Sequence, residues 1–222
     1  MKNMTGKKCI LSYSGGKDSI LALYRAAKMG LQPMGLLTTY NTDLGRSWFH
    51  GIPDPILRAV SESLDLPVSL IRTGGQAYRK NFVAALQRQR RQGTECCVFG
   101  DIDIEEHLEW CTDVCREAGM EAVFPLWKEP RTELVQEFIR LGFISRITVV
   151  DTARLNPCHL GKIITDAEIA AIEAEGADAC GENGEYHSFV SDGPLFRNPV
   201  PFLFGEMQMR GQYAVLPLLV KK

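Results

Sequence analysis

The sequence contains no apolar run close to the roughly 20 residues that a membrane-spanning helix needs, and no apolar segment precedes the first predicted strand. We therefore expect neither a membrane anchor nor a signal peptide. An excess of charge is also lacking: the formal net charge is −2 over 222 residues, so the chain as a whole has no electrostatic footprint for nucleic acid. With 45% hydrophobic and 23% charged residues, the composition is ordinary for a soluble globular protein.

A regular cysteine framework is absent as well. The seven cysteines are an odd number at scattered positions, which predicts reduced thiols and a cytoplasmic location. Cys111 and Cys115 are four positions apart on a predicted helix and can share a face, but no clear second pair of metal ligands accompanies them. We expect both to be small buried residues rather than metal ligands or a redox pair.

The most informative segment is residues 14–19, with the sequence SGGKDS. It follows an apolar stretch, 8–13, that is predicted to be a strand, and a helical pattern comes directly after it. A glycine-rich turn between a strand and a helix N-terminus is an anion site, because free amides and the positive end of the helix dipole point into the turn. Gly15 and Gly16 allow a phosphate to approach closely, and Lys17 adds a positive charge.

Two common phosphate-binding patterns do not match this segment. The Walker A pattern requires Gly and Ser or Thr where this chain has Leu11 and Asp18, and the dinucleotide pattern G-x-G-x-x-G requires separated glycines. Ser14 and Ser19 add hydroxyl donors beside the glycines. A glycine turn that only caps a helix is the simpler alternative, but it does not explain why these six residues occur together after a strand.

Strand-like and helical patterns alternate through the first part of the chain. The predicted strands are 8–13, 34–40, 68–71, 96–100 and 122–125, and the predicted helices between them are 18–29, 53–64, 78–92 and 104–118. This alternation predicts an α/β fold, a doubly wound and mainly parallel sheet, over residues 1–126. Ligands of such sheets bind beyond the carboxyl ends of the strands, where the SGGKDS segment is expected to lie.

Residues 127–222 are expected to form a smaller C-terminal α+β part. Helices are predicted at 132–141 and 165–175, a strand at 146–150, and a terminal hairpin around Gly211. Asp103 with Glu106 and Thr165 with Glu168 have the spacing of capping boxes at the starts of two helices.

A second polar segment lies near the C-terminus, where residues 181–188 read GENGEYHS. Two glycines, two carboxylates, an Asn, a His and a Ser precede an apolar pair. Such polarity is costly in a core and is not needed in a simple turn. Taken alone, the segment is either a structural loop or a substrate site.

The two segments together resemble the diphthine–ammonia ligase family of the PP-loop ATP pyrophosphatase superfamily. That family has SGGKDS near its N-terminus and a GEGGEFET-like stretch near its C-terminus, followed by Pro-Leu-Phe. The matching residues here are 14–19, 181–188 and 194–196, and further matches at 48–50, 125–127 and 160–162 extend the resemblance over essentially the whole chain. Asn183, His187, Ser188 and the stretch 100–103 depart from the family pattern, so the chain resembles a divergent member whose acceptor is left open.

The resemblance implies a fold like that of the adenine nucleotide alpha hydrolases and an ATP-dependent ligase that adenylates a carboxylate, releases pyrophosphate and forms an amide with ammonia. Residues 1–126 would be the PP-loop nucleotide-binding domain, and 127–222 the acceptor-binding domain. ATP and Mg²⁺ are the expected cofactors. The expected partners are ammonia and a carboxylate-bearing acceptor, which is a small molecule or a protein side chain, with a homodimer left open.

Each candidate residue then receives an expected role. The expected ATP-binding residues are Ser14, Gly15, Gly16, Lys17, Ser19, Thr38, Thr39, His50, Gly100 and Asp101. The expected acceptor-binding residues are Gly181, Glu182, Asn183, Gly184, Glu185 and Ser188. The candidate catalytic residues are Lys17, Asp18, Glu185 and His187, with Asp18 also the candidate Mg²⁺ ligand. Simpler structural roles stay open for several of them: a helix cap for Asp18 and Asp101, a polar strand end for Thr38 and Thr39, and a packing role for His50.

Two other functions are alternatives. A PP-loop tRNA-modifying enzyme is expected to have a basic surface or an added RNA-binding domain, which the near-neutral charge disfavours. A non-catalytic sensor would hold ATP or AMP without cleaving it. The basic residues between 79 and 91 are expected to be a solvated helix face, and we expect neither a nucleic-acid nor a membrane partner.

Overall fold

The computed structural model describes residues 4–48 and 50–221. The chain divides into two compact units, and each is described by itself. Among the described residues, the first unit contains 4–14, 18–48 and 66–128. The second unit contains 15–17, 50–65 and 129–221. The SGGKDS segment is therefore divided: Ser14, Asp18 and Ser19 belong to the first unit, and Gly15, Gly16 and Lys17 belong to the second. The assignment of nucleotide binding to 1–126 and of acceptor binding to 127–222 stays a prediction.

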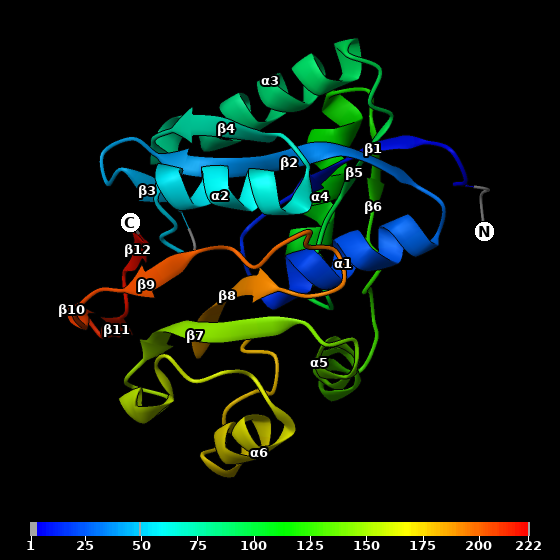
Figure 1. Cartoon of the computed structure of the whole chain (residues 1–222). Coiled ribbons are helices and arrows are strands. Elements are labelled where there is room, and N and C mark those ends of the chain that lie inside the picture. The colour runs from blue at the N-terminus through cyan, green and yellow to red at the C-terminus, as the bar shows by residue number, and fades with distance from the viewer. Residues whose placement is uncertain (1–3, 49, 222) are drawn as a thin grey trace. The chain divides into compact units, whose positions relative to one another are not determined.

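The first unit is built on a mainly parallel sheet (Figure 1). Its strands are β1 (Lys8–Ser12), β2 (Gln32–Asn41), β3 (Arg46–Ser47), β4 (Val68–Thr73), β5 (Cys96–Val98) and β6 (Glu121–Val123). Parallel pairing gives the order β4-β2-β1-β5-β6, with the short β3 antiparallel to β2. The chain thus proceeds outward from β1 to one side and then to the other. This reversal makes the end of β1 the switch point where such sheets bind ligands.

Helices cover both faces of this sheet. They are α1 (Lys17–Lys28), α3 (Tyr78–Arg91), which follows the short η1 (Gly75–Ala77), and α4 (Glu105–Glu117). Ile10, Leu37 and Cys97 project from three neighbouring strands into a core with Phe82 of α3 and Val114 of α4. Figure 1 shows α3 on one side of the sheet and α1 on the other. The predicted doubly wound α/β fold is confirmed.

Two local predictions in this unit are wrong. No side chain caps α4: the extended Ile104 stands between Asp103 and the first helical residue, so Asp103 is one position too early to cap it. Thr38 and Thr39 do not end the second strand, because β2 continues to Asn41 and pairs with β4 over its whole final part. Cys111 and Cys115 are buried on α4, as expected.

The second unit contains an antiparallel sheet in the order β10-β11-β7-β8, together with a separate pair of strands, β9 and β12. The bounds are β7 (Ile144–Asp151), β8 (Tyr186–Asp192), β9 (Phe202–Phe204), β10 (Gln208–Arg210), β11 (Tyr213–Val215) and β12 (Leu218–Val220). The predicted terminal hairpin is confirmed as β10 and β11, which pair with Gly211 between them. The predicted mixed α+β character of the C-terminal part is therefore confirmed, although the unit also contains residues 15–17 and 50–65.

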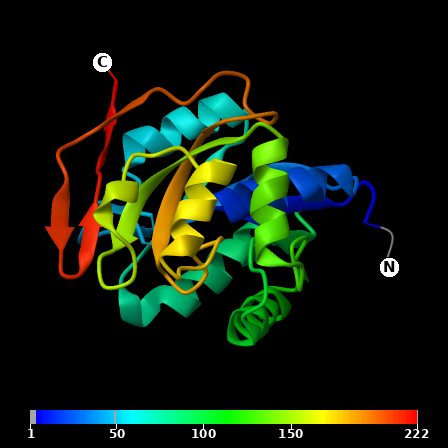
Figure 2. The same cartoon turned by 90° about the horizontal axis from the view of Figure 1, so that it is seen from below.

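The helices of this unit are α2 (Asp54–Leu64), α5 (Arg131–Arg140) and α6 (Asp166–Ala174), with a short η2 (Pro157–His159). Figures 1 and 2 both show α5 and α6 side by side next to β7 and β8, and Thr132 of α5 donates a hydrogen bond to Glu173 of α6. The capping prediction for α6 holds, because the Thr165 hydroxyl accepts from the Glu168 amide at 3.2 Å. In the part of the chain that the structure describes, no helix is long and apolar enough to cross a bilayer.

Candidate functional site

Gly15 and Gly16 lie so close to neighbouring side chains of the second unit that an added Cβ would force those side chains to shift. Gly15 has a φ of +97°, and a Cβ there would lie 2.1 Å from Ile52 Cδ1. A Cβ at Gly16 would lie 2.5 Å from the His50 ring. The Gly15 carbonyl accepts a hydrogen bond from the Val190 amide at 3.0 Å. The packing of Ile52 and His50 therefore favours glycine at both positions, and the binding of an anion in this turn stays a prediction.

Lys17 is the first residue of α1, and its side chain is almost completely buried at 3% exposure. Its ammonium group donates a hydrogen bond to the Cys180 carbonyl and lies 5.5 Å from the centre of the Tyr186 ring. Tyr186 lies in the second polar segment, 181–188, and Cys180 directly precedes it, so Lys17 contacts this part of the second unit. A buried lysine at a helix N-terminus adds its charge to the positive end of the helix dipole.

His50 lies on the other side of Gly16 and connects it to β8. Its Nδ1 is 2.8 Å from the Ser188 carbonyl oxygen, and its ring centroid is 4.9 Å from that of His187. The pKa of His50 is lowered to about 3, chiefly by burial and then by the neighbouring His187 and Lys17, while its contact with the Ser188 carbonyl acts in the opposite direction. Burial, followed by the charge of Lys17, also lowers the pKa of His187. Both rings are therefore neutral near pH 7, and a neutral imidazole can accept a proton.

The loop before β8 is folded around the Glu185 carboxylate. Asn183 donates to it from its amide nitrogen at 3.1 Å and from its side chain at 3.0 Å, and the Asp178 amide approaches at 3.5 Å. Gly181 and Gly184 have φ values of +69° and +85°, which non-glycine residues rarely adopt. Of the predicted segment 181–188, the last three residues belong to β8 rather than to the loop. Ser188 is buried, and Glu182 donates from its amide to Asp178 at 2.8 Å.

In the first unit, the helix start is packed against the end of β5. Ser14 Oγ and Ser19 Oγ are 3.3 Å apart. A Cβ at Gly100 would lie 2.8 Å from the Asp18 carbonyl carbon and from the Ser19 amide, so only glycine fits there. Asp18 lies within the first turn of α1, because the helix begins one residue earlier than predicted. Its acidic side chain is therefore placed near the positive end of the helix dipole.

The other predicted residues of this unit have structural contacts. Thr38 is 1% exposed and donates to the Tyr13 carbonyl at 3.1 Å. The Tyr78 hydroxyl donates to Thr39 Oγ1 at 3.5 Å. Asp101 lies 3.2 Å from His107 Nδ1, and the Cys111 thiol donates weakly to it at 3.8 Å. These contacts join neighbouring elements of the sheet and its helices.

The sequence did not reveal three groups that contact residues 15–17. They are the Ile52 side chain beside Gly15, and the Cys180 carbonyl and the Tyr186 ring beside Lys17. A carbonyl leaves no signature in a sequence, and Ile and Tyr are ordinary core residues. The chemistry of the assembled group is nevertheless specific. A buried ammonium, two neutral imidazoles and close-packed glycines together suit an anion that gains charge and a proton that has to be accepted.

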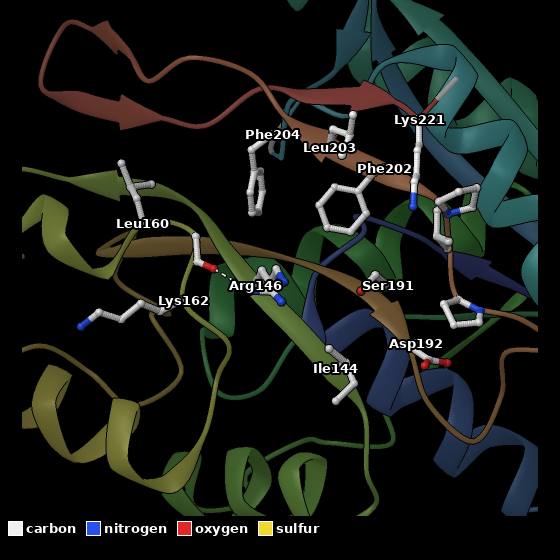
Figure 3. A pocket seen from close by; sticks show the side chains of 14 residues that line it. Ile144, Arg146, Leu160, Lys162, Ser191, Asp192, Phe202, Leu203, Phe204 and Lys221 are labelled. Atoms are coloured by element: carbon white, nitrogen blue, oxygen red, sulfur yellow. Dashed lines mark hydrogen bonds between the residues drawn. The ribbon is translucent and has the colours of Figure 1, made fainter.

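The second unit also contains a cavity of about 890 Å³ that the sequence did not reveal (Figure 3). The Phe202 and Phe204 rings extend from β9 toward Arg146 on β7. Arg146 donates to the Gly161 carbonyl at 3.0 Å, and Lys162 lines the same cavity. The side chains give the cavity mixed apolar and basic walls.

Comparison with known proteins gives two family matches. The model of the diphthamide synthase N-terminal domain matches residues 7–122, and that of the diphthamide synthase C-terminal domain matches residues 130–214. A diphthine–ammonia ligase from Schizosaccharomyces pombe is 21% identical over 94% of this chain and 38% of that protein. A diphthine–ammonia ligase from Mus musculus is 30% identical over 48% of this chain and 41% of that protein. The chain thus spans about two fifths of the length of these curated relatives.

One solved structure, titled as a predicted subunit of a tRNA methyltransferase from Methanocaldococcus jannaschii, covers 87% of this chain and 100% of that chain at 16% identity with a TM-score of 0.45. A likeness of this size carries no argument about function. The residues matched by the two family models include the SGGKDS segment and the GENGEYHS segment respectively, and the chain belongs to the diphthamide synthase family.

Proposed function

We propose that this chain is an ATP-dependent ligase that adenylates a carboxylate, releases pyrophosphate and forms an amide with ammonia. The supporting observation is the contact of Lys17 with Cys180, because Lys17 belongs to the glycine-rich anion segment and Cys180 directly precedes the C-terminal polar segment. Membership of the diphthamide synthase family and the names of the curated relatives support the same reaction.

In the first step, a carboxylate oxygen of the acceptor attacks the α-phosphorus of ATP, and the bond to the β-phosphate oxygen breaks. Negative charge then grows on the leaving pyrophosphate. Gly15, Gly16 and Lys17 would hold this group with amides and an ammonium that are already oriented. Donors placed where charge develops stabilise the transition state more than the ground state. Ser14 and Ser19 would add their hydroxyl groups.

Mg²⁺ suits this site, since magnesium prefers one or two carboxylates together with phosphate oxygens. Asp18 is the carboxylate of the segment, and it would hold the ion directly or through water. The ion would neutralise charge on the phosphates. We assign it no other role in the reaction.

In the second step, ammonia attacks the carbonyl carbon of the acyl-adenylate, AMP leaves, and the nitrogen loses a proton. His187 is the proposed acceptor of this proton, because its lowered pKa leaves an unprotonated ring nitrogen near pH 7. Glu182 and Glu185 are proposed to shape the acceptor site with Asn183 and Gly184. Glu185 would do so indirectly, because its carboxylate holds the loop together through hydrogen bonds from Asn183.

The cellular setting proposed for this reaction is the cytoplasm, since all seven cysteines are free thiols. The proposed acceptor is a carboxylate of the diphthine type, which is the substrate class named for the curated relatives.

The test is to incubate the protein with ATP, Mg²⁺, ¹⁵N-ammonium and diphthine, and to follow the products by phosphorus NMR and mass spectrometry. AMP, pyrophosphate and a ¹⁵N-labelled amide are the expected products. ADP with inorganic phosphate would contradict the proposal. Tight binding of ATP with no cleavage would instead favour a sensor.

A further inference from the structure

We propose that Cys158, His159 and Glu175 form a zinc-binding site in the second unit. One ligand atom of each residue lies within 4.8 Å of the others. His159 Nε2 and Glu175 Oε1 are 3.2 Å apart. Two ligands at ordinary Zn–N and Zn–O distances of about 2.0–2.1 Å lie about 3.3 Å from each other in a tetrahedral site. These two atoms therefore already stand at the spacing that a shared zinc ion requires.

The surroundings of His159 orient its ring for this role. The imidazole is 1% exposed, and its Nδ1 lies 2.5 Å from Glu168 Oε1. Metal-bound histidines usually donate their second ring N–H to a carboxylate, which fixes the tautomer and the ring orientation. Glu168 is held in turn by Lys162 at 3.3 Å. Nε2 is thereby directed toward Glu175 and the neighbouring thiol.

Glu175 and Cys158 provide the exposed side of the site. Glu175 Oε2 accepts the Asn156 amide at 2.8 Å, which leaves Oε1 facing the imidazole. The Cys158 side chain is exposed, and its sulfur lies within 4.8 Å of the ligand atoms of His159 and Glu175. The fourth zinc position would face solvent, where water is an ordinary ligand.

The charge of the cluster favours a divalent cation. A Cys158 thiolate, Glu175 and Glu168 bring three negative charges, against the single positive charge of Lys162. A sulfur, an imidazole and a carboxylate form a donor set that zinc accepts, whereas magnesium and calcium prefer oxygen alone. Metal ligands bind in their deprotonated forms, so zinc binding would release protons.

Zinc at this position would join the turn at η2 to the end of α6. Leu160, Gly161 and Lys162, which follow this turn, line the cavity shown in Figure 3. The ion would thus fix one wall of that cavity. This role does not depend on the proposed ligase reaction.

The experiment is titration of the metal-free full chain with Zn²⁺ by calorimetry, and with Co²⁺ followed by absorption. We expect one tight site per chain, proton release on binding, and a thiolate-to-cobalt charge-transfer band. Cys158→Ser should abolish that band, and Cys158→Ser and Glu175→Gln should each weaken zinc binding at least tenfold. Both residues are exposed, so these variants should keep the fold, which circular dichroism checks.

Glu173→Gln is the matched control, because Glu173 is an exposed carboxylate on the same helix two positions away; it should bind zinc like the wild type. The proposal is overturned if the wild type binds no zinc at micromolar concentration. It is equally overturned if Glu175→Gln binds zinc as tightly as the wild type, since that result would mean that Glu175 is not a ligand and that the Cys158 thiol binds zinc without it.

Discussion

The ammonium group of Lys17 donates a hydrogen bond to the backbone carbonyl of Cys180, 163 positions later in the chain. Both residues belong to the second unit, where the bond joins the SGGKDS segment to the loop that leads into β8. The lysine that is proposed to hold the leaving phosphates therefore also touches the residue that directly precedes the segment proposed for the acceptor. Any change in one segment is expected to affect the position of the other.

Lys17→Ala should lower pyrophosphate release by about 100-fold or more, because an oriented charge is lost where negative charge develops. Circular dichroism should show the fold retained. Lys28→Ala is the matched control, since Lys28 ends the same helix and is exposed; it should release pyrophosphate like the wild type. Wild-type release by Lys17→Ala would refute the role assigned to this lysine.

Gly16→Ala should destabilise the protein by about 1–3 kcal/mol, the usual cost of inserting a methyl group into a packed region. The new Cβ would meet the His50 ring at 2.5 Å. In the double variant, His50→Ala should restore about 1 kcal/mol or more of the stability lost by Gly16→Ala. Urea unfolding of the wild type, both single variants and the double variant would measure this coupling. Gly74→Ala has no atom within 4 Å of its Cβ and serves as the control. Strict additivity of the two substitutions would contradict the contact.

Acidification should destabilise the protein through His50. Its folded pKa is about 3, below the ordinary value of 6.5, chiefly because of burial. Between these values the unfolded state binds the proton and the folded state does not, so stability is full above 6.5 and falls as the pH decreases. His50→Gln should reduce the loss between pH 6.5 and pH 5 by about 1–2 kcal/mol. If the stability of the wild type and of His50→Gln changed with pH in the same way, His50 would not be the cause of the acid destabilisation.

Glu185→Gln should impair use of the acceptor more than binding of ATP. An amide group in place of one carboxylate oxygen would face a donor of Asn183 and loosen the loop. Acceptor-dependent AMP formation should decrease, while the dissociation constant for ATP, measured by calorimetry, should change less than threefold. Glu206→Gln, a change at an exposed position, is the control. Equal losses of both properties would argue against a separate acceptor site.

Much of the fold was predictable because its determinants are local. Apolar stretches such as Cys96–Val98 and periodic helices such as Tyr78–Arg91 carry their structure in the spacing of their residues. The Thr165 cap is equally local. The cap predicted at Asp103 was not found, because α4 begins at Glu105 and Ile104 occupies the capping position. A difference of one residue is enough to move a side chain out of reach of the free amides of the first helical turn.

The site was only partly predictable, because its geometry depends on contacts between distant residues. The glycines of SGGKDS could be read as points of close approach, but not the Ile52 and His50 side chains that require them. The carboxylate of Glu185 looked like a ligand-binding group in the sequence, whereas its neighbours in the structure are the amides of its own loop. Tertiary packing determines such partners, and residue type alone does not reveal them.

The most direct measurement is a crystal structure of the full chain with Mg²⁺ and an ATP analogue that resists cleavage between the α- and β-phosphates. The account predicts that the β- and γ-phosphates contact the backbone amides of residues 15–19 and the Lys17 ammonium. A nucleotide bound elsewhere, with this segment free of phosphate, would contradict it.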